Sequence, residues 1–326
     1  MLRYIGKRLL MLIPIMLGIT LIVLCFIHIA PGDPARMKAG TQASEEEINA
    51  LREEWGLNDS FGVRYFRFWK NVLRGDFGTS YMNERAVKNE MLTRFRYTFI
   101  ISVLSVTLSV IIGIPLGVFA ATHQYTWKDN AAVALSLICV SMPAFWFALL
   151  IIQLFSVKLH LLPPSGIESW KGWILPTISL ALGYIAMITR QMRSNMLEVI
   201  RQDYIVTVRA KGQVERKILY RHALKNAIIP IVQIVGSLFG MSLGGAMIAE
   251  VIFSVPGLGS YMLTGLTNRD YPVIQATSFF MSLVFSIVII LVDILFAFID
   301  PRIRSQYVRR KKKQEVKELN KAGGEA

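Results

Sequence analysis

Long uninterrupted apolar runs alternate with shorter polar segments along most of the chain. Runs of about 20 residues are long enough for a helix to cross the roughly 30 Å hydrocarbon core of a bilayer. We therefore predict an all-α, polytopic membrane protein with six transmembrane helices. Those helices are predicted at Leu9 to Ala30, Thr98 to Ala121, Ala131 to Val157, Trp173 to Ile188, Ile228 to Phe253 and Ser278 to Ile299.

The fourth run is the weakest of the six, because Pro176 and Gly183 interrupt a short stretch. Such a segment needs tilt or a neighbouring chain to span a bilayer. The first run follows three basic residues, as a signal peptide does, but it is too long and no small-residue cleavage site follows it. We interpret it as a retained first helix.

The longest polar segment, residues 31–97, is predicted to form a small external cap between the first two transmembrane helices. Ser44 followed by Glu47 is typical of a capping box, which opens a helix predicted from Glu45 to Trp55 and ended by Gly56. Two shorter external loops are predicted at 158–172 and 254–277 because proline and glycine cluster there.

Composition supports the membrane interpretation, since 53% hydrophobic residues and a mean hydropathy of +0.46 are too high for a soluble domain. The net charge of +14 raises the question of nucleic-acid binding. Segments 1–8, 122–130, 189–227 and 300–326 hold 22 of the 36 Lys and Arg residues but only 8 of the 22 acidic residues. This partition is typical of cytoplasmic segments. It predicts both termini inside and no nucleic-acid partner.

These patterns divide the chain into four parts. Residues 1–30 form the tail and first helix, and 31–97 form the external insertion. Residues 98–299 form a core of five transmembrane helices that contains the basic loop 189–227, and 300–326 form a basic cytoplasmic tail.

The chain contains no HExxH, G-x-S-x-G or phosphate-binding Gly-Lys-Ser/Thr motif. Cys25 and Cys139 lie in apolar runs with no metal-site spacing. We therefore expect a chain that is not an enzyme and that binds no metal or cofactor.

Asp293 lies inside the sixth run, where burying a carboxylate without a partner costs much free energy. We favour an ion-pair or hydrogen-bonding role over a proton relay, because we find no second buried carboxylate to pass a proton to.

Two sets of glycines are spaced by four residues, Gly113 and Gly117 on the second helix and Gly236, Gly240 and Gly244 on the fifth. Small residues at this spacing let two helix backbones approach closely. We predict helix packing at both strips, with a lining of the solute pathway as the alternative.

The basic loop between the fourth and fifth runs has an amphipathic pattern. Over 195–211 apolar side chains recur at helical spacing opposite charged ones, Gly212 interrupts the pattern, and a second short amphipathic run follows. The loop is thus predicted to form a helix, a glycine turn and a second helix. Such a loop can bind a partner ATPase or lie on an anionic lipid surface.

The sequence of this loop, DYIVTVRAKG at 203–212 and RHALKNAIIP at 221–230, resembles the permease subunits of binding-protein-dependent ABC importers of the dipeptide, oligopeptide and nickel group. The resemblance extends over nearly the whole chain, through RLL at 8–10, PGDP at 31–34, GDFGTS at 75–80, SMPAF at 141–145, PGLG at 256–259, RDYP at 269–272 and DPR at 300–302. It indicates the first of two paired permeases, with a type I permease-like fold.

The resemblance implies that the loop docks in a groove of the ATPase. Arg209 and Lys211 would offer charge to an acidic groove. The general signature has Glu-Ala-Ala where this chain has Val-Thr-Val at 206–208, and a proline where Lys225 stands. Gly212 is kept, so the docking role carries over and the role of the leading Glu does not. The implied docking residues are Asp203, Tyr204, Arg209, Ala210, Lys211, Gly212, Arg221, His222, Asn226 and Pro230.

The implied function is half of an ATP-driven pathway for dipeptides or oligopeptides in a bacterial inner membrane. The implied partners are a homologous second permease, two ABC ATPases that bind ATP and magnesium, and an extracytoplasmic solute-binding protein. Nickel, metal-chelator complexes and glutathione are alternative cargoes. A proton-coupled secondary transporter, which needs several intramembrane carboxylates, and an intramembrane protease, which needs a catalytic pair, are alternatives of another class.

Overall fold

The computed structural model describes residues 2–299. The basic tail 300–326, including the DPR motif, lies outside the described residues. Residues 2–299 are mostly helical, with no β-strand. The helices are α1 (Leu2–Ile29), α2 (Pro34–Ala39), α3 (Glu45–Glu54), α4 (Phe61–Leu73), α5 (Val87–Thr122), α6 (Trp127–Ser141), α7 (Ala144–Ile152), α8 (Ile174–Ile200), α9 (Asp203–Ala210), α10 (Glu215–Lys217), α11 (Leu224–Ala227), α12 (Ile229–Ile252), α13 (Leu258–Thr267) and α14 (Tyr271–Ile299), with π-helical turns at Gln153–Lys158 and Ile218–Ala223 and a 3₁₀ turn at Trp170–Trp173.

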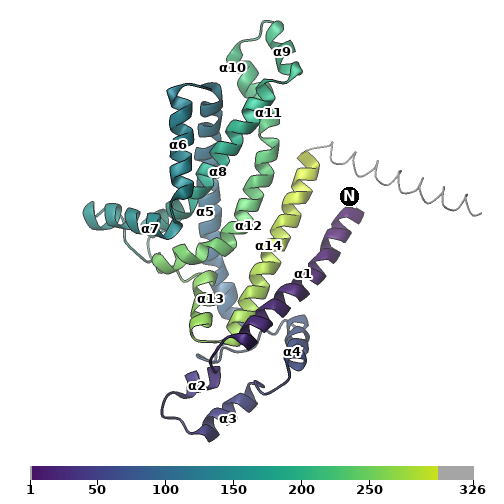
Figure 1. The fold of residues 1–326 in the computed structure, drawn as a ribbon, viewed down its shortest axis with the longest axis vertical. Coiled ribbons are helices and arrows are strands. Elements are labelled where there is room, and N and C mark those ends of the chain that lie inside the picture. Colours follow the sequence, from purple (N-terminus) through teal and green to yellow (C-terminus); the bar gives the residue numbers. More distant parts are fainter. Residues whose placement is uncertain (1, 300–326) are drawn as a thin grey trace, which may run out of the picture.

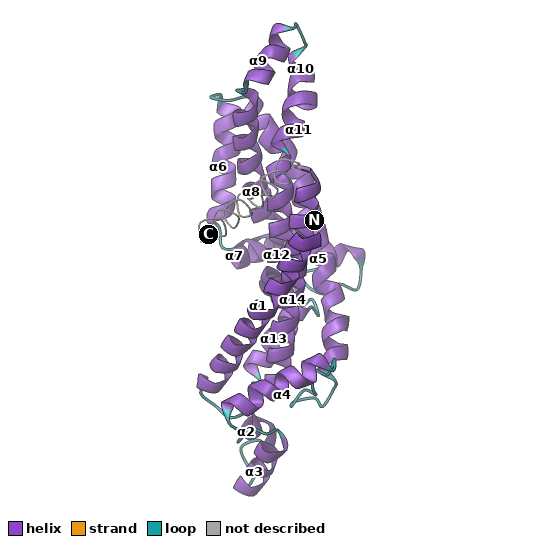
Figure 2. Ribbon diagram, turned by 90° about the vertical axis from the view of Figure 1, so that its right-hand side faces the viewer, coloured by secondary structure: helices purple, strands orange, loops and turns teal. Residues whose placement is uncertain are grey.

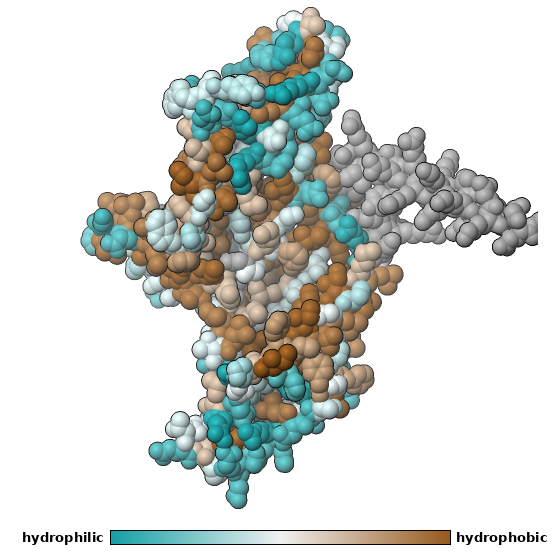
Figure 3. All heavy atoms as spheres, in the orientation of Figure 1, coloured by the Kyte–Doolittle hydropathy of each residue, from teal (hydrophilic) through white to brown (hydrophobic). Residues whose placement is uncertain are grey.

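The molecule is elongated, with a bundle of long helices between two small helical ends. The short helices α2, α3 and α4 form one end, which we call the insertion end, and α9 and α10 form the other, which we call the loop end (Figures 1 and 2). Apolar residues dominate the surface between these ends, and hydrophilic residues dominate both ends (Figure 3). This distribution is the one expected of a protein that crosses a bilayer along its long axis.

Among residues 2–299, four helices are long and apolar enough to cross a membrane, and the number rises to six if two bent helix pairs each make one span. The start of α1 and the end of α14 both point toward the loop end, whereas the end of α1 and the start of α14 lie at the insertion end (Figure 1). The described ends of the chain thus share one side with the basic loop.

The third apolar run is not one straight helix, contrary to our prediction. It breaks at Met142 and Pro143 into α6 and α7, whose axes differ by 100°. Proline disfavours helical geometry in the residue before it, and Met142 accordingly adopts an extended backbone with ψ 127°. As a result α7 lies across the bundle rather than along it (Figure 1).

The fourth run, predicted to be the shortest, is one of the longest helices. Helix α8 continues from Ile174 to Ile200, well past the predicted end at Ile188. Pro176 causes no break because it lies in the first turn, where its missing N–H has no partner to lose. Gly183 is accommodated because the helix packs along α5.

Two other predicted boundaries are wrong. The segment 254–277, predicted to be a loop, contains α13 and the start of α14. Helix α5 begins at Val87, three turns before the predicted start at Thr98. The early starts of α5 and α14 have the same cause. The polar residues that ended our predicted runs continue the helices beyond the apolar band into the insertion end.

The predicted capping box is confirmed in the insertion. Ser44 accepts a hydrogen bond from the N–H of Glu47, and Glu47 accepts one from the N–H of Ser44, at the start of α3. Asp33 has a similar role at α2, where it accepts from the N–H of Ala35 and pairs with Arg52 of α3 at 2.6 Å. These contacts fix α2 and α3 against one another.

The orientation in the membrane can be tested by thiol labelling. In a chain without Cys25 and Cys139, we expect Glu46→Cys and Ser165→Cys to react with a membrane-impermeant maleimide in intact cells. Ala210→Cys, at the exposed loop end, should react only after the cells are opened, because the basic segments are retained inside. Labelling of Ala210→Cys in intact cells would contradict the orientation.

Candidate functional site

The loop between α8 and α12, residues 201–227, is the candidate site at the loop end. We call it the 201–227 loop. A turn at Arg201 and Gln202 separates α8 from α9, so the predicted single helix from residue 195 is in fact two helices. Gly212 then turns the chain with φ +77°, which confirms the predicted glycine turn before the second helical segment.

The apolar face of the 201–227 loop belongs to the core of the bundle. Ile205, Ile218 and Ala223 are fully buried, in one cluster with Met192 and Met196 of α8. The same cluster extends to α5 and α12. Because interiors are close-packed, any displacement of the loop would be transmitted to the inner parts of these helices.

Polar contacts fasten the two halves of the loop to each other. Arg209 donates to Glu215 at 2.6 Å, the Asn226 amide donates to the Tyr204 hydroxyl at 2.7 Å, and His222 lies 3.0 Å from Gln213. Nine of the ten residues that the family resemblance implies lie in this loop, and Pro230 lies in the first turn of α12. His222 is half-buried, and Asp203, Tyr204, Arg209, Ala210, Lys211, Gly212, Arg221, Asn226 and Pro230 are exposed.

The structure modifies the role expected of Arg209. Its guanidinium is paired with Glu215 inside the loop, and this hydrogen bond holds the pKa of Arg209 above its ordinary value. Arg209 thus braces α9 against α10. Among the described residues, unpaired basic charge at the surface comes from Lys211, as expected, and from Arg216 and Lys217, which border a shallow groove with Val214 and Tyr220.

The exposed surface of the loop also carries large apolar side chains. Val206, Val214 and Tyr220 have exposed fractions of 53%, 72% and 56%. Apolar anchors surrounded by basic residues are typical of a surface that binds an acidic protein groove. A lipid surface would be served by the same charges.

The glycines of α5 lie against α8. A Cβ at Gly113 would come within 2.9 Å of the Ile188 side chain, and one at Gly117 within 2.7 Å of the Thr189 carbonyl. Serines complete this close contact, since Ser105 and Ser109 donate across to the carbonyls of α8 at 3.2 Å. The α5 and α8 backbones therefore pack as small-residue interfaces do in membranes.

The glycines of α12 do not act alike. Gly236 faces the Val292 side chain of α14, and a Cβ at Gly240 would lie 3.0 Å from the Phe285 ring. Gly244 has no atom within 4 Å of the equivalent position, so no described residue packs against it and its predicted packing role stays a prediction. It borders an apolar groove of about 550 Å³ between α1, α12 and α14.

A polar face follows the neighbouring helices α8 and α12. On α8 the exposed polar residues Gln191, Ser194 and Glu198 recur at helical spacing, and on α12 the exposed Gln233 is followed one turn later by the partly exposed Ser237. These residues lie in the parts of α8 and α12 nearest the loop end, and those of α8 fall within the basic segment 189–227. This face was not among our sequence predictions, although the spacing of its polar residues could have indicated it.

Asp293 has a partner, as we expected of a carboxylate in a span. Its carboxylate lies 2.9 Å from the guanidinium of Arg8 on α1. Our statement that no second carboxylate is buried is wrong, however, because Glu250 near the end of α12 is fully buried. Glu250 accepts hydrogen bonds from the Thr98 hydroxyl at 2.5 Å and from the N–H of Ser260 at 2.8 Å.

The short motifs of the insertion end converge in space although they are far apart in sequence. The carboxylate of Asp270, from RDYP, accepts from the Ser80 hydroxyl of GDFGTS and from the N–H of Tyr81. Tyr81 stacks on Trp55 with ring centroids 3.9 Å apart, and burial raises the pKa of Tyr81 to about 12. Gly32 of PGDP lies against Arg269. These contacts tie the insertion to the start of α14.

Comparison with known proteins decides the family. Residues 113–305 match the family described as "Binding-protein-dependent transport system inner membrane component", and residues 1–102 match its N-terminal counterpart. The chain belongs to this family. It is therefore a permease subunit of an ABC importer, which confirms the resemblance carried by the loop motifs.

The relatives of this permease include glutathione transport system permease proteins GsiC. The protein from Salmonella typhimurium is 40% identical and the one from Escherichia coli K12 is 38% identical, each over 304 residues that make up 93% of this chain and 99% of the relative. In fold, the permease is similar to a chain of the inward-facing MetNI methionine ABC transporter, with a TM-score of 0.56 and 18% identity over 64% of this chain and 96% of that one.

Proposed function

We propose that this permease forms half of the pathway by which an ATP-driven importer takes up small peptides of the glutathione type. The observation that supports glutathione as the cargo is the set of relatives at 38 to 40% identity, which are named glutathione transport permeases. Dipeptides and oligopeptides, our first expectation, remain candidate cargoes of the same chemical class. The polar face of α8 and α12 supports the proposal because a zwitterionic peptide needs hydrogen-bonding groups where its route reaches the loop end.

The 201–227 loop is proposed to dock on the ATPase. Its buried face joins the core of α5, α8 and α12, and its exposed face is apolar and basic. A movement of the ATPase would thus reach the helices of the pathway without bending the loop. The remaining partners in this proposal are a homologous second permease, a second ATPase and an extracytoplasmic solute-binding protein, with ATP and magnesium bound on the ATPases.

Reconstitution tests the proposal directly. In proteoliposomes that contain both permeases and the ATPases, we expect uptake of labelled glutathione to need two components. ATP must be present on the side of the membrane that holds the ATPases, and the solute-binding protein must be present on the opposite side. Unlabelled dipeptides should compete less well than glutathione, and Ni²⁺ should not compete. Uptake driven by a proton gradient without ATP would contradict an importer of this kind, and competition by Ni²⁺ alone would contradict the peptide cargo.

A further inference from the structure

Helix α6 is held to the rest of the bundle by very few buried groups. Only Asp129 and Ser136 of this helix are buried, and the Ser136 hydroxyl donates to the Ala132 carbonyl of its own helix. Most of the other side chains of α6 are exposed or half-buried apolar groups. The helix must therefore depend on a small number of specific contacts to follow its neighbours.

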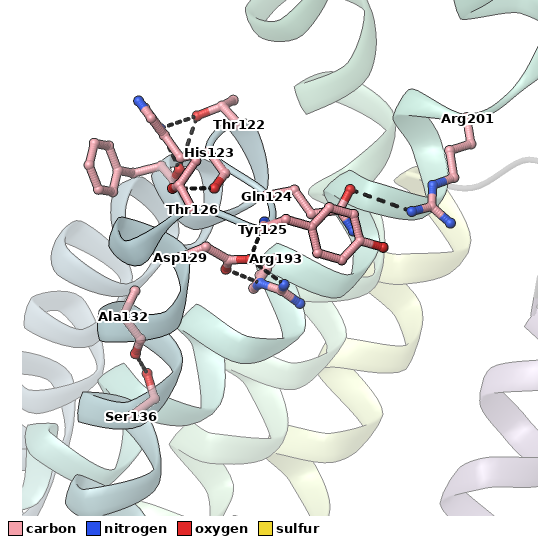
Figure 4. A network of polar contacts seen from close by, with 11 residues as sticks. Thr122, His123, Gln124, Tyr125, Thr126, Asp129, Ala132, Ser136, Arg193 and Arg201 are labelled. Atoms are coloured by element: carbon pink, nitrogen blue, oxygen red, sulfur yellow. Dashed lines mark hydrogen bonds and ion pairs between the residues drawn. The ribbon is translucent and has the colours of Figure 1, made fainter.

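The strongest of these contacts is a forked ion pair between α6 and α8 (Figure 4). The Arg193 guanidinium donates from Nε to Oδ1 of Asp129 at 2.5 Å and from Nη2 to Oδ2 at 2.7 Å. The Asp129 side chain is only 2% exposed, and it also accepts from the N–H of Tyr125. Within residues 2–299, no other ion pair or side-chain hydrogen bond joins α6 to α8.

Arg193 lies where α8 meets the 201–227 loop. Its neighbours Met192 and Met196 hold the loop residues Ile205 and Ile218 in the core. A second contact, from Arg201 to Gln124 at 3.4 Å, joins the turn before α6 to the end of α8 (Figure 4). The ion pair therefore joins α6 to the part of α8 that the loop moves.

Helix α6 leads in turn to the opposite half of the molecule. It continues through Pro143 into α7, where Ala148 and Ile151 are buried in one cluster with Phe253, which follows α12. Helix α7 packs on both α8 and α12. A displacement of α6 would thus reach the end of α12 that lies nearest to the insertion.

We propose that the Asp129–Arg193 ion pair is the link that carries movement of the 201–227 loop and α8 to α6, and through α7 to the end of α12. The inference rests on the proposed function, in which an ATPase moves the loop. A forked carboxylate–guanidinium pair suits this task because two parallel hydrogen bonds fix both distance and direction, whereas apolar side chains can slide past one another. Asp129 and Arg193 are positioning residues, since neither needs to touch solute or nucleotide.

The test uses the reconstituted complex with wild-type partners and measures ATP hydrolysis and glutathione uptake in the same proteoliposomes. We expect Asp129→Asn and Arg193→Gln each to lower the solute moved per ATP by about tenfold, within the usual range for loss of one coupling interaction. Glu168→Gln, the same carboxylate-to-amide change at an exposed loop position, should leave the ratio unchanged.

Two rescue experiments separate coupling from mere stability. A double variant with Asp129→Arg and Arg193→Asp exchanges the two charges. It should restore most of the solute moved per ATP, because the ion pair forms again with opposite polarity. In a chain without Cys25 and Cys139, Asp129→Cys with Arg193→Cys should be uncoupled until a short bifunctional thiol reagent joins the helices. The rescue arms also decide the matter if a single variant fails to assemble.

The possible outcomes point in different directions. Single variants with a wild-type ratio, or variants whose hydrolysis and uptake fall in parallel and recover in neither rescue, would overturn the link. Absence of ATP-dependent uptake in the wild-type complex would count against the proposed function instead.

Discussion

Replacing Gly212 with valine is expected to abolish coupled uptake while leaving the permease inserted in the membrane. Gly212 turns the 201–227 loop with φ +77°, and no atom lies within 4 Å of the position that a Cβ would take. The effect of valine is therefore backbone strain rather than a clash, about 1–2 kcal/mol for an L-residue and more for a β-branched one. The turn would open and misplace α9 relative to α10.

The measurement is receptor-stimulated ATP hydrolysis and solute uptake, together with crosslinking from the exposed Ala210→Cys to the ATPase. Gly212→Asn is the matched control, because asparagine adopts positive φ more readily than any β-branched residue. We expect near wild-type uptake for asparagine and loss of uptake with altered crosslinking for valine. Wild-type uptake in Gly212→Val, or no ATPase contact anywhere along the loop, would favour the lipid-surface interpretation of the loop.

Gly117→Ala is expected to prevent assembly of a stable permease. The added Cβ would lie 2.7 Å from the Thr189 carbonyl and 2.5 Å from the Met192 Cβ, so α5 and α8 would have to move apart. Overpacking of this kind costs typically about 1–3 kcal/mol, and the upper end applies where backbone rather than a flexible side chain obstructs. The same displacement would disturb the cluster that holds the 201–227 loop.

Gly183→Ala on α8 is the matched control, since no atom lies within 4 Å of its added methyl group. Alanine there should stabilise the helix by about 0.5–1 kcal/mol. Yield of the assembled complex and its melting temperature in detergent report both changes. Gly240→Leu, which meets the movable ring of Phe285, should fall between the two. An unaltered yield for Gly117→Ala would show that α5 and α8 are not packed as closely as the structure places them.

The sequence by itself determined that the chain is built from apolar helices of spanning length, and it determined the position of the turn in the loop. Apolar runs of spanning length, the partition of basic residues and the capping box at Ser44 are local signals, because each depends on residues near one another in the chain. The glycine turn at Gly212 is local in the same sense. The family motifs added the importer function, which no periodicity could supply.

Only the tertiary structure decided which helices bend and which polar groups meet. The proline pattern alone did not show that Pro143 breaks a helix while Pro176 does not, because the outcome depends on position within the helix and on packing. The pairs Asp129 with Arg193, Ser80 with Asp270 and Thr98 with Glu250 are separated by 64, 190 and 152 residues. Such contacts depend on how the helices pack, and helix packing is a property of the whole bundle rather than of any segment of sequence.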